Sequence, residues 1–331
     1  YWIFNEPKTK EEFLQAKDKF LSASYLEREQ LISEGEKFNK NQPKKFAHFG
    51  SSENITGDYI YHSKNVTKSY IVDNCENIKY STNISYANDL VDVDYWGDHS
   101  QQCFECAEIG TQASNIQFSR NVYSDVSNIY YSLSCCLGCH DVFGCVCMKH
   151  AEYCVLNKKY SKQEYEELVA RIIGHMQQTG EWGEFFPMSM SQFAYNETAA
   201  MDYFPLEKDE AIKIGAYWQD ENYDQTRGNA TRELEDIMVY TDQTKAQELL
   251  SSVLVCKQTG RPYKIQGQEL AFYLRNHIQI PLHHPNLRYQ RRFRQINPQT
   301  IYHRSCQCEQ ANHGHNGKCA NEFETTYAPD R

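Results

Sequence analysis

The middle of the chain carries a repeat in which a polar residue is followed by an apolar one, nine times in succession. The polar residues are Asn54, Asn65, Asn77, Asp89, Gln102, Asn115, Asn128, Asp141 and Glu152, in steps of 11 to 13 residues. Two positions before each of them, from Ser52 to Cys139, stands a small residue; only His150, before the last, is large. A unit this short cannot enclose a core alone, so successive units have to stack on one another.

This pattern predicts a β-solenoid over residues 50–157. Small side chains fit the corner of a coil, the apolar ones stack inside, and an Asn side chain can bond the backbone at the turn or the coil above. We expect two units in each coil, which gives roughly four coils of about 25 residues. The alternative is a stack of β-hairpins whose spacing coincides by chance.

Two segments of the chain share one order of parts. YWIFNEPKTKEEF (1–13) and YCVLNKKYSKQEY (153–165) each have a tyrosine, an apolar run, an Asn and then a Thr or Ser followed three residues later by Glu. The last pair forms a capping box at a helix start. We therefore expect each segment to be the last rung of a solenoid followed by a helix that covers its open strand edges. The first copy then indicates that the chain begins inside a longer protein.

The two capping helices are predicted with different lengths. After Ser161, apolar residues recur with a helical period as far as Met176, which predicts a helix ending near Gly180. After Thr9 the segment is more charged, and we expect one helix running to about Gly35. Residues 181–227 are rich in aromatic residues, and we expect them to form an irregular extension with short helices. A polar linker is expected near residues 220–245.

Composition narrows the class of protein. Of 331 residues, 40% are hydrophobic and 13% aromatic, which is typical of a folded chain. No apolar run approaches the roughly 18 residues that cross a bilayer, so no membrane span is expected. The net charge of −10 argues against a chain that binds nucleic acid over its whole surface. The 13 cysteines are interpreted mostly as reduced thiols, which favours a cytoplasmic location.

Six of these cysteines lie between residues 134 and 154, where the sequence reads SCCLGCHDVFGCVCMKHAEYC. Several of them are in phase with the repeat, and a free Cys behaves as a small buried hydrophobe. We therefore expect stacked interior thiols. A zinc or iron–sulfur site and a set of disulfides remain the alternatives.

Long stretches outside the repeat resemble a known group of proteins. NKKYSKQEYEELVARIIGHM, GEWGEFFPMSMSQFAYNETAAMDYFPL, HRSCQCEQ and NEFETTYAPDR are similar to a functionally uncharacterised family of hypothetical proteins from candidate-phyla (Patescibacteria) bacteria. In that family, Cys-rich repeat segments alternate with helices and zinc-ribbon modules. The resemblance implies a ribbon near the C-terminus of this chain and implies no activity.

The resemblance also indicates that this ribbon is degenerate. The family pattern is Cys-x-x-Cys followed by Cys-Pro-x-Cys; here Cys256 is retained, Thr259 stands at the second position, and His284 and Leu287 stand at the last two. Cys256 and His284 alone cannot complete a tetrahedral structural zinc site. We expect this module to keep its fold by packing.

The tail holds a second candidate metal site, with zinc as the possible cofactor. Its cysteines and histidines are Cys306, Cys308, Cys319, His303, His313 and His315. Thiolate and imidazole are the groups that bind structural zinc. The alternative is a mobile polar tail.

A basic stretch supports a second class of function. LRYQRRFR (287–294) contains Arg288, Arg291, Arg292 and Arg294 with aromatic residues between them, and three of these arginines would share one helix face. This arrangement suits nucleic-acid binding. It also suits a surface helix that pairs with the excess acidic residues of the chain.

No catalytic constellation stands out. The best cluster is Asp92, Asp94, Asp98 and His99 in VDVDYWGDHS, because solenoids can present paired carboxylates to sugars. Asp92 and Asp94 alternate along one strand, however, so we expect them to be solvated. The preferred hypothesis is a non-enzymatic structural protein that self-assembles into a homo-oligomer or binds a protein partner, and nucleic acid is the less favoured partner.

The resulting fold prediction is mainly β with helices. Residues 1–49 would be the last strand and capping helix of a preceding module, and residues 50–157 the β-solenoid. Residues 158–245 would hold the capping helix, aromatic extension and linker, and residues 246–331 a degenerate zinc-ribbon-like module.

Overall fold

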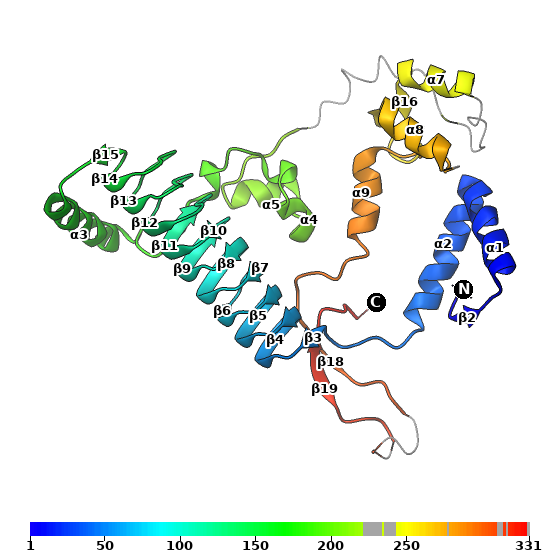
Figure 1. Ribbon diagram of the computed structural model, residues 1–331, viewed down its shortest axis with the longest axis horizontal. Helices are drawn as coiled ribbons and strands as arrows, with labels where there is room; N and C mark the ends of the chain where they lie inside the picture. Colours follow the sequence, from blue (N-terminus) through cyan, green and yellow to red (C-terminus); the bar gives the residue numbers. More distant parts are fainter. Residues whose placement is uncertain (221–233, 235–242, 277, 310–313, 316, 330–331) are drawn as a thin grey trace. The chain divides into compact units, whose positions relative to one another are not determined.

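The computed structural model describes residues 1–331 except 221–233, 235–242, 277, 310–313, 316 and 330–331 (Figure 1). It divides into two units, each built from two separated segments. The first unit combines residues 1–44 with 219–296, and the second combines 45–218 with 297–331. Most of the predicted 220–245 linker lies outside the described residues. The four domain boundaries given above follow the order of the sequence and stay predictions.

The second unit contains the solenoid. Its strands are β3 (Phe49–Gly50), β4 (Glu53–Tyr61), β5 (Lys64–Asp73), β6 (Glu76–Lys79), β7 (Thr82–Ser85), β8 (Asn88–Asp98), β9 (Gln101–Ala107), β10 (Gly110–Thr111), β11 (Ala113–Arg120), β12 (Val126–Tyr130), β13 (His140–Phe143), β14 (Glu152–Val155), β15 (Lys158–Lys159), β18 (Tyr302–Ser305) and β19 (Glu322–Thr325). Its helices are α3 (Lys162–Thr179), α4 (Ala200–Tyr203) and α5 (Lys208–Lys213), with single 3-10 turns at Met188–Met190 and Tyr195–Glu197.

The solenoid is confirmed, but each repeat unit forms a whole coil. Val66 lies beside Ile78, Ile78 beside Leu90 and Leu90 beside Cys103, all in parallel register. The column continues through Ile116, Ile129, Val142 and Cys154. Successive members are 12 or 13 residues apart, so the predicted coil of two units, and the count of four coils, were wrong. The structure has about nine turns.

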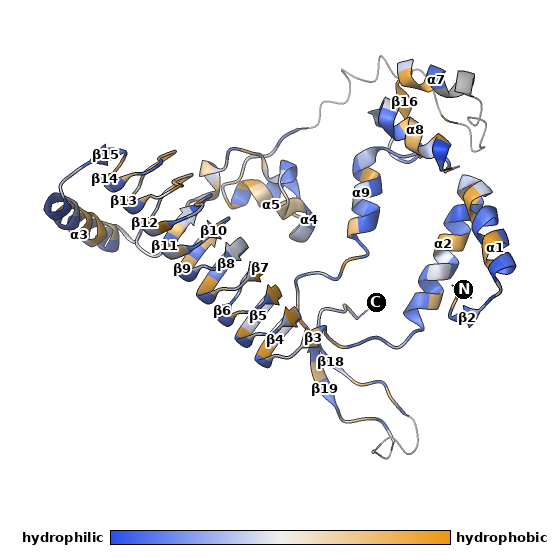
Figure 2. Cartoon of the chain, in the orientation of Figure 1, coloured by the Kyte–Doolittle hydropathy of each residue, from blue (hydrophilic) through white to orange (hydrophobic). Residues whose placement is uncertain are grey.

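The coil closes in so few residues because every third side chain points inward. Ser63, Val66, Ser69 and Val72 begin this series, and all four are buried. The residue just before an inward one commonly has a positive φ, for example 54° at Asn65 and 45° at Lys68. That left-handed conformation turns the chain after each short extended step, and Asn and Asp adopt it more readily than other side chains except Gly. Figure 2 shows hydrophobic residues recurring from coil to coil instead of forming long runs.

The predicted interior is confirmed for the core column and the corners. Ile78, Ile116, Ile129 and Val142 are 0% exposed and Cys103 is 2% exposed. The small corner residues from Ser63 to Cys139 are buried too. The last repeat unit was misplaced by one residue. Asp141 is followed one coil later by Tyr153, not Glu152, because His140 pairs with Glu152 and Val142 with Cys154.

The cysteines of the 134–154 segment form no disulfide, and four of them are interior thiols, as predicted. Cys135, Cys139, Cys145 and Cys154 are buried, whereas Cys147 is exposed. Their S–H groups point to backbone carbonyls of the coils; Cys139 Sγ, for instance, lies 3.2 Å from the oxygen of Cys136. These thiols therefore act as small core residues.

The last coil of the solenoid is covered within the second unit, and a hairpin lies beside the first coils (Figure 1). At the last coil, β15 pairs antiparallel with β14, and α3 packs its Tyr165, Leu168 and Ile172 against Phe143 and Val155. This helix begins at the predicted Ser161–Glu164 capping box and ends at Gly180, as expected. At the first coil, the β18–β19 hairpin contacts β4.

A buried carboxylate fastens this hairpin. The Thr326 hydroxyl donates to Asp58 Oδ2 at 2.5 Å, and Asp58 Oδ1 accepts from the backbone N–H groups of His48 and Tyr59. Asp58 is 1% exposed. A charge this deeply buried has to be fully hydrogen-bonded, and these contacts satisfy it.

The described part of the first unit is mainly helical, with two small antiparallel strand pairs. Its elements are β1 (Trp2–Ile3), β2 (Glu6–Pro7), α1 (Lys10–Ser22), α2 (Tyr25–Lys40), α7 (Gln243–Ser251), β16 (Leu254–Val255), β17 (Pro262–Tyr263), α8 (Gly267–Arg275) and α9 (Pro285–Phe293). The strand pairs are β1–β2 and β16–β17. The Thr9–Glu12 capping box is present, but the single helix predicted to Gly35 was wrong. The chain is extended at Ala23 and Ser24, where a second capping box, Ser24 with Glu27, starts α2.

Among the described residues, no helix is long and apolar enough to cross a membrane.

Candidate binding cavity on the solenoid

One outward column of the solenoid leaves a hollow around Asp94. In register order this column is Tyr70, Thr82, Asp94, Ala107 and Arg120. Thr82 and Ala107 are short, so the coils on either side of Asp94 do not fill the space above it. Tyr70 and Arg120 are long and bound the hollow at its two ends.

Other segments of the second unit wall this hollow and make it a cavity of about 760 Å³. Ala199, Ala200, Tyr203 and Phe204 come from α4 and its flanks, and Gln299 comes from the segment before β18. Gln299 Nε2 donates to Thr82 Oγ1 at 3.2 Å, which ties that segment to the solenoid face. The volume lies within the range of small-molecule sites.

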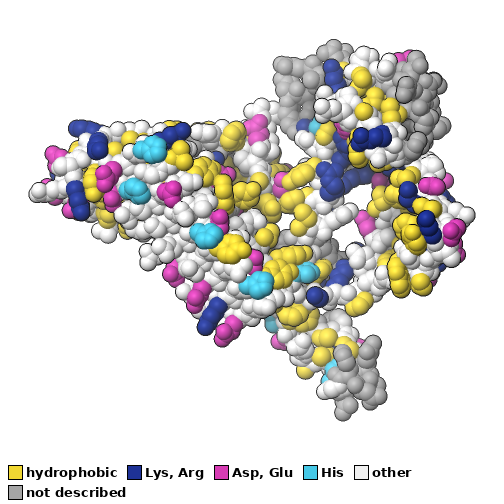
Figure 3. Space-filling model, in the orientation of Figure 1, with side chains coloured by type: hydrophobic (Ala, Val, Ile, Leu, Met, Phe, Trp, Pro, Cys, Tyr) yellow, Lys and Arg dark blue, Asp and Glu magenta, His cyan; other side chains and the backbone are white. Residues whose placement is uncertain are grey.

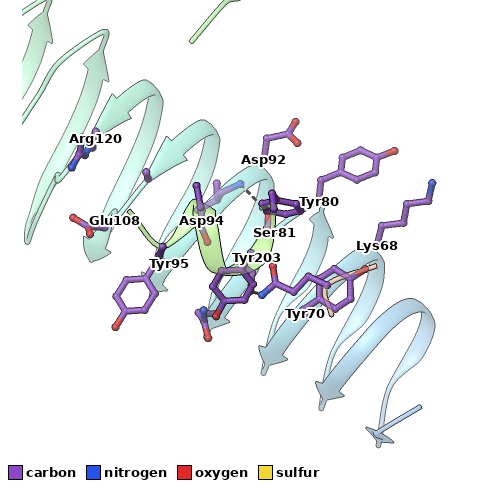
Figure 4. A pocket seen from close by; sticks show the side chains of 18 residues that line it. Lys68, Tyr70, Tyr80, Ser81, Asp92, Asp94, Tyr95, Glu108, Arg120 and Tyr203 are labelled. Carbon is purple, nitrogen blue, oxygen red and sulfur yellow. Dashed lines mark hydrogen bonds between the residues drawn. The ribbon is translucent and has the colours of Figure 1, made fainter. Parts of the chain in front are cut away.

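The remaining lining residues belong to the solenoid. They are Lys68, Tyr80, Ser81, Asn83, Asp92, Val93, Tyr95 and Glu108. Figure 4 shows Asp94 in the middle of the group, Arg120 and Lys68 toward opposite ends, and the carboxyl of Asp92 directed away from that of Asp94.

The acidic groups of the cavity are not neutralised by a neighbouring cation. Burial raises the pKa of the Asp94 carboxyl, and the negative charge of Glu108 raises it further. Glu108 Oε2 accepts from the Tyr123 hydroxyl at 3.1 Å. Within the described part of the chain, no ion pair joins Asp94 or Glu108 to a Lys or Arg. A positive charge placed beside Asp94 would therefore gain energy.

The cluster proposed from VDVDYWGDHS is divided by the structure. Asp92 and Asp94 line the cavity; Asp94 is exposed, as expected, whereas Asp92 is half-buried and burial raises the pKa of its carboxyl. Asp98 and His99 do not line it; Asp98 Oδ1 and His99 Nδ1 lie 2.8 Å apart.

No family model, curated protein or solved structure matches the chain. The resemblance to the Patescibacteria family stays a prediction, and the assignment of a function rests on the chemistry of the sites.

The basic stretch forms the predicted helix, α9, where Lys and Arg side chains gather in Figure 3. Two of its arginines are engaged within the first unit. Arg288 lies 3.1 Å from Glu269 Oε1 and donates to the Tyr273 hydroxyl. Arg291 lies 3.0 Å from Glu29 Oε1 on α2. Arg292 and Arg294 are exposed.

Cys256 lies in a turn whose hydrogen bonds favour the thiolate form of its side chain. Burial would raise the pKa of its thiol, but hydrogen bonds from the Thr259 side chain and from the backbone N–H groups of His284, Thr259 and Gln258 lower it below its usual value. The ring beside the thiol belongs to His283, whose Nδ1 is 3.8 Å from Sγ. The ring of His284 instead accepts from the backbone N–H of Asn286 at the start of α9.

The tail cysteines lie toward the tip of the β18–β19 hairpin. The backbone N–H of Cys319 donates to the carbonyl of Cys308 at 3.0 Å, and that of Cys306 donates to Asn321. The His303 ring lies 3.3 Å from the Glu322 carboxylate. His315 bonds to the Gly317 carbonyl.

His313 lies outside the described residues. Among the described residues, no group of three or more His, Cys, Asp or Glu is placed to hold a metal ion. The zinc site of the tail stays a prediction.

Sequence reasoning missed the residues that make the cavity. Thr82 and Ala107 carried a usable signal, since they are small and stand 12 and 13 residues from Asp94, in phase with the repeat. Tyr203 and Gln299 carried none, because they reach the cavity from segments far along the chain.

Proposed function

We propose that this chain is a non-enzymatic structural protein that holds a ligand or partner in the Asp94 cavity of its solenoid. The observation that carries the proposal is the cavity itself, which residues from three separated segments enclose on one face of a repetitive core. Segments that converge in this way give a site of fixed shape, and a site of fixed shape binds without a large ordering cost.

A binding role is favoured over catalysis by the directions of the carboxylates. Glycoside hydrolysis needs two carboxyl groups that face one substrate from opposite sides. The carboxyls of Asp92 and Asp94 point apart in Figure 4. The covered last coil likewise favours partner binding over the end-to-end assembly of copies, because a paired and capped edge recruits no further strand.

We further propose that residues 246–296 keep the packing of a zinc ribbon without the metal. The support is the Cys256 turn, in which hydrogen bonds from Thr259 and from the backbone of His284 bridge the two loops that a zinc ion would otherwise join. Nucleic-acid binding by α9 is less supported, since Arg288 and Arg291 are already paired with Glu269 and Glu29.

A screen that assumes no ligand class tests the proposal. A chemically varied set of small molecules is tested by ligand-observed NMR against the wild-type chain and against Ala107→Trp, in which the indole fills the hollow. The control is Ser114→Trp, a substitution at another outward strand position that does not line the cavity.

We expect binders that are lost in Ala107→Trp and retained in Ser114→Trp. If no compound of any class depends on Ala107, the cavity is not a binding site. Light scattering on the same samples measures the mass, and a monodisperse monomer at all concentrations would count against self-assembly.

A further inference from the structure

The charge of the Asp94 cavity has a definite spatial order. Asp94 is central, and Glu108, on the side of Arg120, is close enough to raise its pKa; Asp92 also lines the cavity, and the two cations, Lys68 and Arg120, lie toward opposite ends (Figure 4). The centre therefore attracts a positive charge, and Lys68 and Arg120 oppose a second one placed beside them. A polycation would gain at the centre and lose at both ends.

The aromatic residues that line the cavity also favour a positively charged ligand. Tyr70, Tyr95 and Tyr203 line the cavity with Phe204, and Tyr95 is 55% exposed, so its ring is available to a ligand. The face of an aromatic ring carries negative electrostatic potential and attracts ammonium groups. The same rings accept the apolar body of a ligand, as in most small-molecule sites.

We propose that the cavity binds an organic ligand through a single protonated amine, seated between Asp94 and Glu108 and surrounded by the tyrosine rings. The inference rests on the proposed binding function and names its ligand class. Two sources can supply such a group, an amino sugar and a lysine-type side chain. The body of either ligand would lie along the column over Thr82 and Ala107, because these two side chains are short and leave space above them.

Pairs of probes that differ only in charge test this inference. Calorimetry compares methyl glucosaminide with its N-acetylated form, and Nα-acetyl-lysine methylamide with its Nε-acetylated form. In each pair the amine should bind at least tenfold more tightly, because the ammonium forms a charge-assisted hydrogen bond with the carboxylate and the neutral amide does not. Added salt should reduce the difference. Whichever pair binds more tightly identifies the source of the amine.

Two variants test whether the carboxylate of Asp94 is the group that binds the amine. Asp94→Asn keeps the shape of the side chain and removes its charge, and it should weaken amine binding at least tenfold while leaving the acetylated probes unchanged. Glu76→Gln removes one charge at an exposed strand position outside the cavity and should change neither. Circular dichroism confirms that both variants fold.

Several outcomes would overturn the inference. They are equal binding of charged and acetylated probes, indifference to Asp94→Asn, tighter binding of spermidine than of either monoamine, and no binding of any amine. If the screen yields only neutral or anionic compounds whose binding is lost in Ala107→Trp, the ligand class is wrong but the proposed binding function stands.

Discussion

The side-chain amide of Asn77 donates to the carboxylate of Asp89, one coil further along the solenoid, across 2.8 Å. A carboxylate can only accept, so the amide of Asn77 has to present its nitrogen to Asp89 and its oxygen to Asn65. The same direction extends back to Asn54. A second ladder runs from Asn115 through Asn128 to Asp141. Each ladder thus takes its direction from the Asp at its end.

Removing one rung of the ladder should destabilise the solenoid. Asn77→Gly tolerates the positive φ of 59° and loses two side-chain hydrogen bonds, so we expect a loss of about 1 to 2 kcal/mol in the free energy of unfolding. Denaturant unfolding measures it. The control is Asn74→Gly, which has a φ of 55° and no side-chain bond in the ladder. Equal losses in both variants would mean that the ladder contributes nothing.

The core column should tolerate truncation poorly. Ile116→Ala removes a fully buried aliphatic side chain and should cost about 2 to 5 kcal/mol in urea unfolding. Ile71→Ala changes the same residue type at a position that is 50% exposed, and it should stay within about 0.5 kcal/mol of the wild type. A small effect of Ile116→Ala would place that residue outside the packed core.

Thiol labelling should separate interior from exposed cysteines. Burial raises the pKa of Cys103 and of Cys135 to about 12, so almost no thiolate is present at neutral pH. The thiolate is the reactive form, so in the native protein at pH 8 these two should resist a disulfide reagent that labels exposed Cys147. Both should react after unfolding in guanidinium chloride. Peptide mass mapping assigns the labelled sites, and rapid native labelling of Cys103 would contradict the packing.

The arginines of α9 should stabilise the first unit more than they bind polyanions. A double-mutant cycle with Arg291→Ala and Glu29→Ala should give a coupling of about 0.5 to 1 kcal/mol, as expected for a partly exposed ion pair. Arg292→Ala paired with Glu29→Ala is the control and should show no coupling.

Binding of RNA or DNA should be negligible before and after replacement of Arg288, Arg291, Arg292 and Arg294. If these residues contact phosphates instead, affinity should fall steeply with salt, with a logarithmic slope of about −0.9 per phosphate contact on duplex DNA. Micromolar, salt-sensitive binding that the quadruple substitution abolishes would show that the basic stretch is a nucleic-acid site.

The zinc hypothesis for the tail is tested by metal content. Elemental analysis should find about one zinc per chain, lost when Cys308→Ser and Cys319→Ser are combined and unchanged by Cys256→Ser. A stoichiometry of two or more would require another site, in the ribbon or in the 134–154 segment. Absence of zinc from the wild-type protein would exclude the tail site.

The sequence alone was sufficient for the solenoid, its core column, its corner residues, the two capping boxes and α3. These features depend on neighbours within the repeat or within one helix, and such local rules leave a visible period. It was not sufficient for the length of a coil. Inward positions recur every third residue, but Ser69, Ser81 and Ser132 occupy some of them and hide the period. They are tolerated inside because their hydroxyls accept backbone N–H groups of the next coil, as Ser81 does from Val93.

Only the tertiary structure decided which distant residues meet. Thr326 reaches Asp58, Gln299 reaches Thr82 and Tyr203 reaches the Asp94 cavity across long stretches of chain. It also placed His283, and not His284, beside the Cys256 thiol. The repeat sequence determines how the coils stack, because each coil contacts only the coils next to it. Contacts between separated segments depend on shape and charge over the whole surface, and that information has no period in the sequence.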